Sequence, residues 1–329
     1  MTSPNIRENG LDVFRLLAAI GVISVHVGFF EGFNSEEMAA AIRLSGRWAV
    51  PFFFILSGYL ISSNNSSIRA LNPLVKAVTI FIVASVMLIP LSVANYGIHE
   101  TLVKIFSSGF LMSGTYFHLW YLSSVVVGLL ILLVIEKQGL ERFLPPIAIL
   151  SILLYLVMGA YNPVSEAGIK VARHFSSVGF LYLGMILGRT KPTAFKGSLI
   201  LVIGFGIQLI EAKALTYIFE FKSILKYQFL IGTILFSIGA FILARSIRPN
   251  TFRVLGLLGA KHSLSIYIFH PYFIYIFKLI PLSPLLSDLL IIPSVFTLSL
   301  IFSLVLEKKL KSFYCIVNGD FKFLKKKEY

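Results

Sequence analysis

The first long apolar segment contains three ionisable side chains. Asp12, Arg15 and His26 lie within the run LDVFRLLAAIGVISVH. Ionisable groups inside a membrane-spanning helix cost free energy, and by default they indicate a functional site. Asp12 and Arg15 are three positions apart, so they share one face of a helix. The competing interpretation of these two is a simple ion pair at the membrane interface.

Arg15 and His26 are eleven positions apart, which is close to three whole helical turns, so both side chains point the same way. A rise of 1.5 Å per residue separates them by about 16 Å along the helix axis, so they cannot touch. A fixed cation suits a phosphate-bearing donor, whereas a neutral imidazole suits proton transfer. An extended donor such as acyl-CoA could join the two positions. For His26 alone, a hydrogen bond between helices is the alternative.

Three later segments also place polar side chains within apolar surroundings. They are Ser57, Gly58 and Tyr59 in FFFILSGYLIS, His118 and Trp120 in FHLWYLSS, and Tyr267 and His270 in SLSIYIFHPYFIY. Tyr267 and His270 share a helix face, and Pro271 opens the local hydrogen bonding. Taken alone, the three segments also fit close helix packing, an outer aromatic belt and polar contacts between helices.

Other kinds of catalytic centre find no support in the sequence. There is one cysteine, Cys315, and no Cys, His or carboxylate grouping has the spacing of metal ligands. His99, His174 and His262 fall in predicted loops and are assigned no role. Asp12 is the one carboxylate well within a predicted span, which excludes a paired-carboxylate mechanism. The carboxylate partner of His26 stays open among Glu31, Glu36 and Glu37. We therefore expect no metal and no permanently bound cofactor.

The composition predicts the elements that must position these residues. Of 329 residues, 57% are apolar and 13% are charged, against about 25% charged in soluble proteins. A soluble enzyme and a disordered chain are excluded, and an all-α polytopic transmembrane helical bundle is predicted. The net charge of +14 follows from basic loops and a basic tail, which indicate membrane orientation and not binding of nucleic acid.

About ten spans are predicted in a single membrane domain, 1–329, whose core runs from about 10 to 306. The spans are 11–30, 46–62, 77–95, 117–135, 146–160, 175–188, 197–210, 228–244, 263–281 and 289–306. Alternating them from an inner N-terminus gives a roughly two-to-one excess of Lys and Arg on the inner side. Both termini are then cytoplasmic, Arg43 and Arg47 lie on the outer side, and residues 307–329 form a basic cytoplasmic tail. We expect a bacterial inner (plasma) membrane protein whose first span is retained.

The segments LDVFRLLAAIGVISVH, FFFILSGYLI, HLWYLSS, FLYLGMILGR and SLSIYIFHP, in this order, resemble the acyltransferase-3 family of bacterial integral-membrane O-acyltransferases. The resemblance runs from about residue 10 to 306. It implies that His26 is catalytic and that Arg15, with Asp12 beside it, binds the donor or organises the site. The family pattern also includes positions whose individual roles are less settled. In this chain they are Ser57, Gly58, Tyr59, His118, Trp120, Tyr267 and His270. Many members carry an arginine-rich stretch after the second span, where this chain has only Arg69 and Lys76.

The resemblance implies transfer of an acyl group, acetyl by default, from cytosolic acyl-CoA to a hydroxyl of a carbohydrate. The expected acceptor is an O-antigen, an exopolysaccharide or another lipid-linked glycan on the periplasmic side. His26 would act as general base or first take the acyl group itself. The alternative is a transporter or flippase for a glycan precursor, although the sequence halves show no duplication. The expected partners are acyl-CoA, the carbohydrate and the lipid bilayer. A homo-oligomer and a succinyl donor both stay open.

Overall fold

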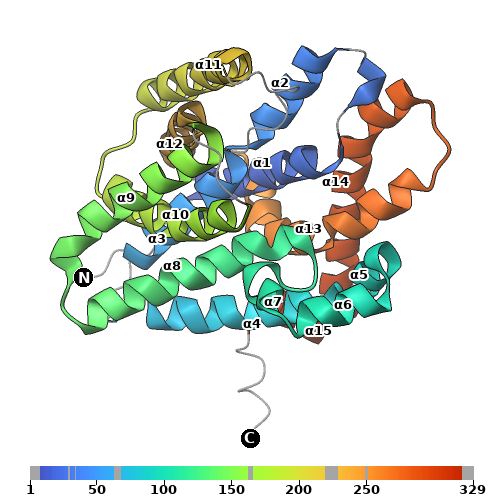
Figure 1. Cartoon of the computed structure of the whole chain (residues 1–329), viewed down its shortest axis with the longest axis horizontal. Helices are drawn as coiled ribbons and strands as arrows, with labels where there is room; N and C mark the ends of the chain where they lie inside the picture. Colours follow the sequence, from blue (N-terminus) through green and yellow to red (C-terminus); the bar gives the residue numbers. More distant parts are fainter. Residues whose placement is uncertain are drawn as a thin grey trace, which may run out of the picture. The chain divides into compact units, whose positions relative to one another are not determined.

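The structure is a computed structural model of the whole chain, and it describes residues 8–28, 30–33, 35–62, 68–161, 166–218, 229–248 and 251–320. Every regular element in those ranges is a helix, with no strand among them (Figure 1). The prediction of an all-α fold is therefore confirmed for the described part of the chain.

The helices belong to two compact units, and the chain passes between them. Unit 1 comprises residues 1–56, 159–162 and 187–301, and unit 2 comprises residues 57–158, 163–186 and 302–329. The helices of unit 1 are α1 (Asn9–His26), α2 (Glu36–Gly46), α11 (Ala194–Ile218), α12 (Ile231–Ser246) and α13 (Arg253–Lys278), with the short turn η1 (Glu31–Phe33). The helices of unit 2 are α4 (Leu71–Met87), α5 (Ile89–Tyr96), α6 (Ile98–Ile105), α7 (Ser108–Ser113), α8 (Trp120–Lys137), α9 (Leu144–Leu156), α10 (Glu166–Leu187, whose last residue falls in unit 1) and α15 (Lys311–Val317), with η2 (Phe117–Leu119) and η3 (Glu141–Phe143). Three elements cross the division: α3 (Ala49–Ser62), the π-helical turn η4 (Val157–Tyr161) and α14 (Pro284–Lys309).

Each of the ten segments predicted as spans overlaps a helix, although several boundaries move by several residues and residues 29 and 228 lie outside the described part of the chain. Six helical stretches among the described residues are long and apolar enough to cross a membrane: Asn9–His26, Glu36–Ser62, Phe117–Lys137, Glu141–Tyr161, Ala194–Ile218 and Pro284–Lys309. A seventh is obtained if α4 and α5 form one bent span. These helices make the chain a membrane protein. The larger number of ten spans and the cytoplasmic position of both termini stay predictions.

Two sequence-based assignments were wrong. The three histidines placed in loops lie in helices: His99 in α6, His174 in α10 and His262 in α13. The polar stretch after the first span forms a helix, α2, instead of a loop. Ser35 caps α2 by accepting a hydrogen bond from the Met38 N–H at 3.2 Å. Glu36 and Glu37 in its first turn add negative charge where the helix dipole favours it.

In unit 1, helices α11 and α12 pack along a seam of glycines. Gly197 and Gly204 on α11 and Gly232 and Gly239 on α12 are seven positions apart in each helix, which places each pair on one face. A Cβ atom built on any of the four would lie within 2.5 Å of a backbone nitrogen of the facing helix. Helices surrounded by lipid gain little from apolar burial, so close backbone approach of this kind is what holds them together.

Helix α1 packs against α13 and α14 through a second close contact. A buried apolar cluster joins them, with Leu16, Ala19 and Ile23 from α1, Ile266 and Ile274 from α13, and Ile291 and Val295 from α14. At Gly259 of α13 the two backbones approach so closely that a Cβ atom would overlap the carbonyl oxygen of Asp12. This crossing fixes the rotation of α13 about α1, and with it the side chains that α13 presents to His26.

A carboxylate of α11 stabilises the beginning of α12. Glu211 accepts hydrogen bonds from the backbone N–H groups of Ile231 at 2.9 Å and Gly232 at 3.0 Å. The Tyr161 hydroxyl donates a further hydrogen bond to it. The first N–H groups of a helix have no partner within the helix, and a negative charge there also interacts favourably with the helix dipole. Glu211 therefore ties α11, α12 and the η4 turn together.

We expect Glu211→Ala to lower the free energy of unfolding by about 1–2 kcal/mol, the usual cost of removing a helix cap. Glu211→Gln keeps an acceptor oxygen without the charge, so its loss is expected to be smaller. Thermal unfolding of the detergent-purified variants, followed by circular dichroism, measures both. Equal stability of wild type and Glu211→Ala would contradict the capping role.

In unit 2, the beginning of α4 is held by a carboxylate at the end of α8. Glu136 accepts hydrogen bonds from the Ala70 N–H at 3.0 Å and from the Arg69 Nε at 3.2 Å. The other end of α4 turns by 47° into α5. Pro90 lies in the first turn of α5. In a continuous helix its ring would clash with the backbone carbonyl four residues earlier, so the helix bends. A proline within the predicted span 77–95 thus explains why that span is broken.

Candidate functional site

The centre of the candidate site is a pair of histidines from the two packed helices α1 and α13. The rings of His26 and His270 are stacked, with centroids 5.6 Å apart and an interplanar angle of 26°. His270 is fully buried and His26 is partly exposed. Two candidate residues that are 244 positions apart in the chain are thus brought face to face, because Gly259 lets α13 lie directly on α1.

Hydrogen bonding fixes which nitrogen of neutral His270 carries the proton. Its Nδ1 lies 2.7 Å from the carbonyl oxygen of Tyr267. A carbonyl can only accept, so Nδ1–H donates this bond and Nε2 holds the lone pair. The ring of Tyr267 also lies beside His270, with centroids 6.2 Å apart. Tyr267 and His270 therefore form one local unit in α13, as their spacing of three residues predicts.

Two arginines missed by the sequence analysis lie close to His26. Arg43 of α2 donates a hydrogen bond from Nη1 to the carbonyl oxygen of Gly28, at 2.5 Å, two residues beyond His26. Gly46 packs on Gly21 and Ser24 of α1, which brings the end of α2 to the same helical turns. The sequence did contain a sign of this arrangement. Arg43 and Arg47 are four positions apart, which places both on one face of a helix.

The ion pair predicted at the beginning of α1 is present. Arg15 Nη1 lies 2.8 Å from Asp12 Oδ1, with 23% and 9% of the two side chains exposed. Arg15 therefore lies away from His26 along α1 with a carboxylate beside it, as the spacing predicts. Asp12 holds one side of the guanidinium, and this orients its remaining N–H groups.

A cluster of aromatic side chains packs around Phe14, the residue before Arg15 in α1. Phe14 contacts Trp48 and Phe52, with ring centroids 6.1 Å apart in both pairs. Trp48 stacks in turn on Phe236 of α12, at 5.7 Å. This aromatic cluster therefore packs α1, α3 and α12 of unit 1 together around Phe14 and Trp48.

The candidate residues of unit 2 have different neighbours. Gly58 meets the Leu181 backbone of α10 so closely that a Cβ atom would overlap its carbonyl oxygen, as the packing interpretation of the Ser57–Gly58–Tyr59 segment predicts. Arg69 bonds Glu136, as described above, and the Lys76 side chain lies beside Gly319 after α15.

His118 and Trp120 are held by different neighbours within unit 2. His118 is buried, and its ring lies edge-on to that of Tyr116, with centroids 5.7 Å apart. The Trp120 ring carries the guanidinium of Arg173 above it, at 4.2 Å from the centroid. His174 lies edge-on to the same indole, at 6.5 Å. Its ring nitrogens lie 2.7 Å and 2.8 Å from the carbonyl oxygens of Lys170 and Met112. His174 therefore has a structural role, which the sequence analysis missed because it placed this residue in a loop.

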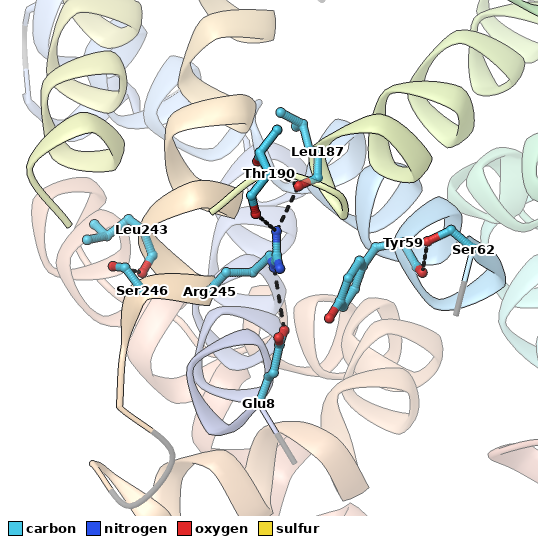
Figure 2. A network of polar contacts seen from close by, with 8 residues as sticks. All are labelled: Glu8, Tyr59, Ser62, Leu187, Thr190, Leu243, Arg245 and Ser246. Atoms are coloured by element: carbon cyan, nitrogen blue, oxygen red, sulfur yellow. Dashed lines mark hydrogen bonds and ion pairs between the residues drawn. The ribbon is translucent and has the colours of Figure 1, made fainter. Parts of the chain in front are cut away.

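A further arginine joins three chain segments of unit 1 (Figure 2). Arg245, near the end of α12, donates from Nη1 to the carbonyl oxygens of Leu187 at 2.7 Å and Thr190 at 3.1 Å. Its Nε lies 3.7 Å from a carboxylate oxygen of Glu8, just before α1. Figure 2 also shows Ser62 bonded to the carbonyl oxygen of Tyr59, a contact within α3. Arg245 therefore anchors the beginning of α1 to the end of α12.

Among the residues that the structure describes, no group of three or more His, Cys, Asp or Glu side chains is placed to hold a metal ion. The described groups near His26 include the imidazole of His270 and the guanidinium of Arg43, with Arg47 four positions further along. A neutral imidazole can take a proton from a hydroxyl, or attack a carbonyl carbon, and the guanidiniums can bind an anion.

The apolar helices and the imidazole pair on two of the helices define a helical membrane protein with a polar site inside one unit. A family model described as an acyltransferase domain matches residues 8–308. Because this match covers nearly the whole chain, the protein belongs to the acyltransferase-3 family, and the resemblance inferred from the sequence is confirmed.

Curated relatives match a smaller part of the chain. An amino-acid racemase of Enterococcus faecalis is 30% identical over 147 residues, which are 41% of this chain and 20% of the relative. A serine/alanine racemase of Enterococcus gallinarum is 30% identical over 139 residues, which are 39% and 19% of the two chains. The chain thus spans about a fifth of the length of the curated relatives it matches. No solved structure matches it.

Proposed function

We propose that this membrane acyltransferase moves an acyl group, acetyl by default, from acyl-CoA to a hydroxyl of a carbohydrate. The observation that carries the proposal is the stacked pair of His26 and His270 at 5.6 Å, within a chain that belongs to an acyltransferase family from residue 8 to 308. The racemase names of the relatives belong to those proteins, and a match to a fifth of their length does not extend racemisation to this chain.

His26 is proposed as the general base. Its neutral ring takes the proton from a sugar hydroxyl while the oxygen attacks the thioester carbonyl carbon of the donor. A carbon–oxygen bond forms, the carbon–sulfur bond breaks, and the proton held by His26 passes to the departing CoA sulfur. In an alternative order of steps, the imidazole of His26 first takes the acyl group from the donor, and the sugar hydroxyl then attacks the acyl-imidazole. The stacked His270 ring holds His26 in place in both routes.

Arg15 is proposed to bind the phosphate groups of acyl-CoA at the cytoplasmic end of α1. Its planar guanidinium suits phosphate oxygens, and Asp12 orients it. The separation of about 16 Å between Arg15 and His26 along the helix suits a long donor whose thioester lies far from its phosphates. The acceptor, a cell-surface or lipid-linked glycan, would then approach His26 from the periplasmic side of an inner membrane.

The test uses purified protein in lipid vesicles, supplied with acetyl-CoA labelled in the acetyl group. We expect release of free CoA that depends on an added glycan fraction, together with transfer of the label to that fraction. A transporter of glycan precursors would move the glycan across the vesicle membrane and release no CoA. The absence of acceptor-dependent CoA release from folded protein would reject the acyltransferase mechanism.

A further inference from the structure

We propose that Arg173, stacked on Trp120 in unit 2, binds the phosphate group of an anionic membrane lipid. The inference goes beyond the proposed reaction, because it concerns a side chain that the acyl transfer does not use and it is tested by lipid contact alone. The sequence analysis singled out Trp120 but not Arg173, which the structure places over the indole ring.

The guanidinium of Arg173 has a defined position on the indole. Its central carbon lies 4.2 Å from the centroid of the Trp120 ring. His174, the next residue of α10, lies edge-on to the same indole at 6.5 Å, and its Nε2 lies 2.8 Å from the carbonyl oxygen of Met112 in α7. These contacts connect α10 with α7 and with the first residue of α8, so three helices of unit 2 hold the guanidinium in place.

The charge of Arg173 is not neutralised within the described part of the chain. No carboxylate of a described residue forms an ion pair with it, and its Nε atom is buried without a hydrogen-bond acceptor. The side chain is partly buried, and contact with a ring face leaves the N–H groups at the edge of the guanidinium free to donate. A phosphate fits this edge, because its oxygens accept charge-assisted hydrogen bonds from a planar guanidinium.

The level of Trp120 along its helix indicates a lipid as the source of the phosphate. Trp120 lies near one end of Phe117–Lys137, an apolar stretch long enough to cross a membrane. The end of a membrane-crossing helix lies at the level of the lipid headgroups, where tryptophan is enriched and arginine side chains extend toward polar groups. The aromatic-belt interpretation of the FHLWYLSS segment therefore agrees with a headgroup phosphate beside Arg173.

Exposed apolar side chains next to Trp120 supply contacts for the acyl chains of such a lipid. Phe117 precedes Trp120 by three positions, which places both on the same side of the helical turns. Leu111 of α7 lies at the beginning of α8, because its carbonyl oxygen accepts a hydrogen bond from the Ser123 hydroxyl. Both Phe117 and Leu111 are exposed. A soluble phosphate ion would gain nothing from these side chains, whereas a lipid places its acyl chains against them.

The experiment uses Trp120 itself as the reporter of lipid contact. The chain contains two tryptophans, so Trp48→Phe leaves Trp120 as the single fluorescent indole. This protein is placed in phosphatidylcholine vesicles with increasing fractions of either phosphatidic acid or phosphatidylcholine that carries brominated acyl chains, which quench indole fluorescence at short range. We expect half-maximal quenching at a fraction of brominated phosphatidic acid about tenfold lower than that of brominated phosphatidylcholine, the effect of a single charge-assisted hydrogen bond.

Arg173→Gln in the same background is expected to bring the ratio between the two lipids to about one. The matched control is Arg142→Gln, because Arg142 lies over the Phe143 ring at 4.7 Å in the same unit but is exposed, and it should keep the tenfold ratio. Equal quenching by both lipids would overturn the inference, and this comparison needs no substitution of Arg173. A ratio that persists in folded Arg173→Gln would also overturn it. Loss of the ratio in inorganic phosphate, but not in chloride of equal ionic strength, would assign the site to a soluble anion and reject the lipid.

Discussion

His26→Ala is expected to lower acyl transfer to the carbohydrate by about two to four orders of magnitude, the usual contribution of a positioned general base. Alanine has no group that can hold the hydroxyl proton. The stacked partner His270 is fully buried, so it does not replace His26. The measurement is the O-acetyl content of the cell-surface glycan, by mass spectrometry, in cells that make equal amounts of wild type and variant. An unchanged content would exclude His26 as the catalytic base.

Two further variants make this test specific. His99→Ala removes an imidazole that is largely exposed on α6, and its glycan acetylation is expected to equal that of wild type. In His26→Ala/His270→Ala the second substitution is expected to add little to the first, because residues that act as a unit lose their shared effect only once. A double variant that is far less active than His26→Ala would show that His270 acts independently of His26.

The second large effect is expected from a single methyl group at Gly259. A Cβ atom there would overlap the Asp12 carbonyl oxygen of α1, and backbone cannot move aside as a flexible side chain can. Gly259→Ala must therefore separate α1 from α13, at a cost of about 3 kcal/mol or more. Thermal unfolding of the purified variant should occur roughly 5–10 °C lower. Acyl transfer should fall as well, because the same crossing positions His270 on His26.

The matched control for this substitution is Gly206→Ala on α11. A Cβ atom at Gly206 meets no other atom within 4 Å. Alanine in a helix is favoured over glycine by about 0.5–1 kcal/mol, so this variant should be as stable as wild type or slightly more so. If both variants unfold at the wild-type temperature, the close contact at Gly259 does not limit the packing of α1 on α13.

The helical fold and the pairing of Asp12 with Arg15 could be predicted from the sequence because both follow from local patterns. Apolar runs determine where helices form, and each of the ten predicted segments overlaps a helix among the described residues. A spacing of three residues predicted the Asp12–Arg15 contact, which is 2.8 Å. The 47° bend between α4 and α5 was missed because Pro90 lies inside an apolar run and the prediction used only the length of the run.

The meeting of His26 and His270 could not be predicted from spacing, since it depends on how α13 crosses α1. The family resemblance named both residues but gave no contact between them. Arg43 and Arg47 were missed for another reason. The sequence analysis took every arginine outside an apolar run as a signal of membrane orientation. It therefore overlooked arginines on a helix that packs back on its neighbour. The same limit applies to Glu211, whose role depends on N–H groups twenty residues further along the chain.

Unit 1 is assembled mainly from residues 1–56 and 187–301, with most of unit 2 lying between them in the sequence, and this order matters while the protein is being made. His270 follows His26 by 244 positions, which a ribosome covers in roughly 12–50 s at ordinary rates of synthesis. During that interval α1 enters the bilayer with Asp12, Arg15 and His26 but without the helix that packs on them. The newly inserted helix therefore needs temporary shielding of these groups, from lipid headgroups, the insertion machinery or α2, which follows within ten residues. The stacked pair of His26 and His270 can form only after translation has passed α13.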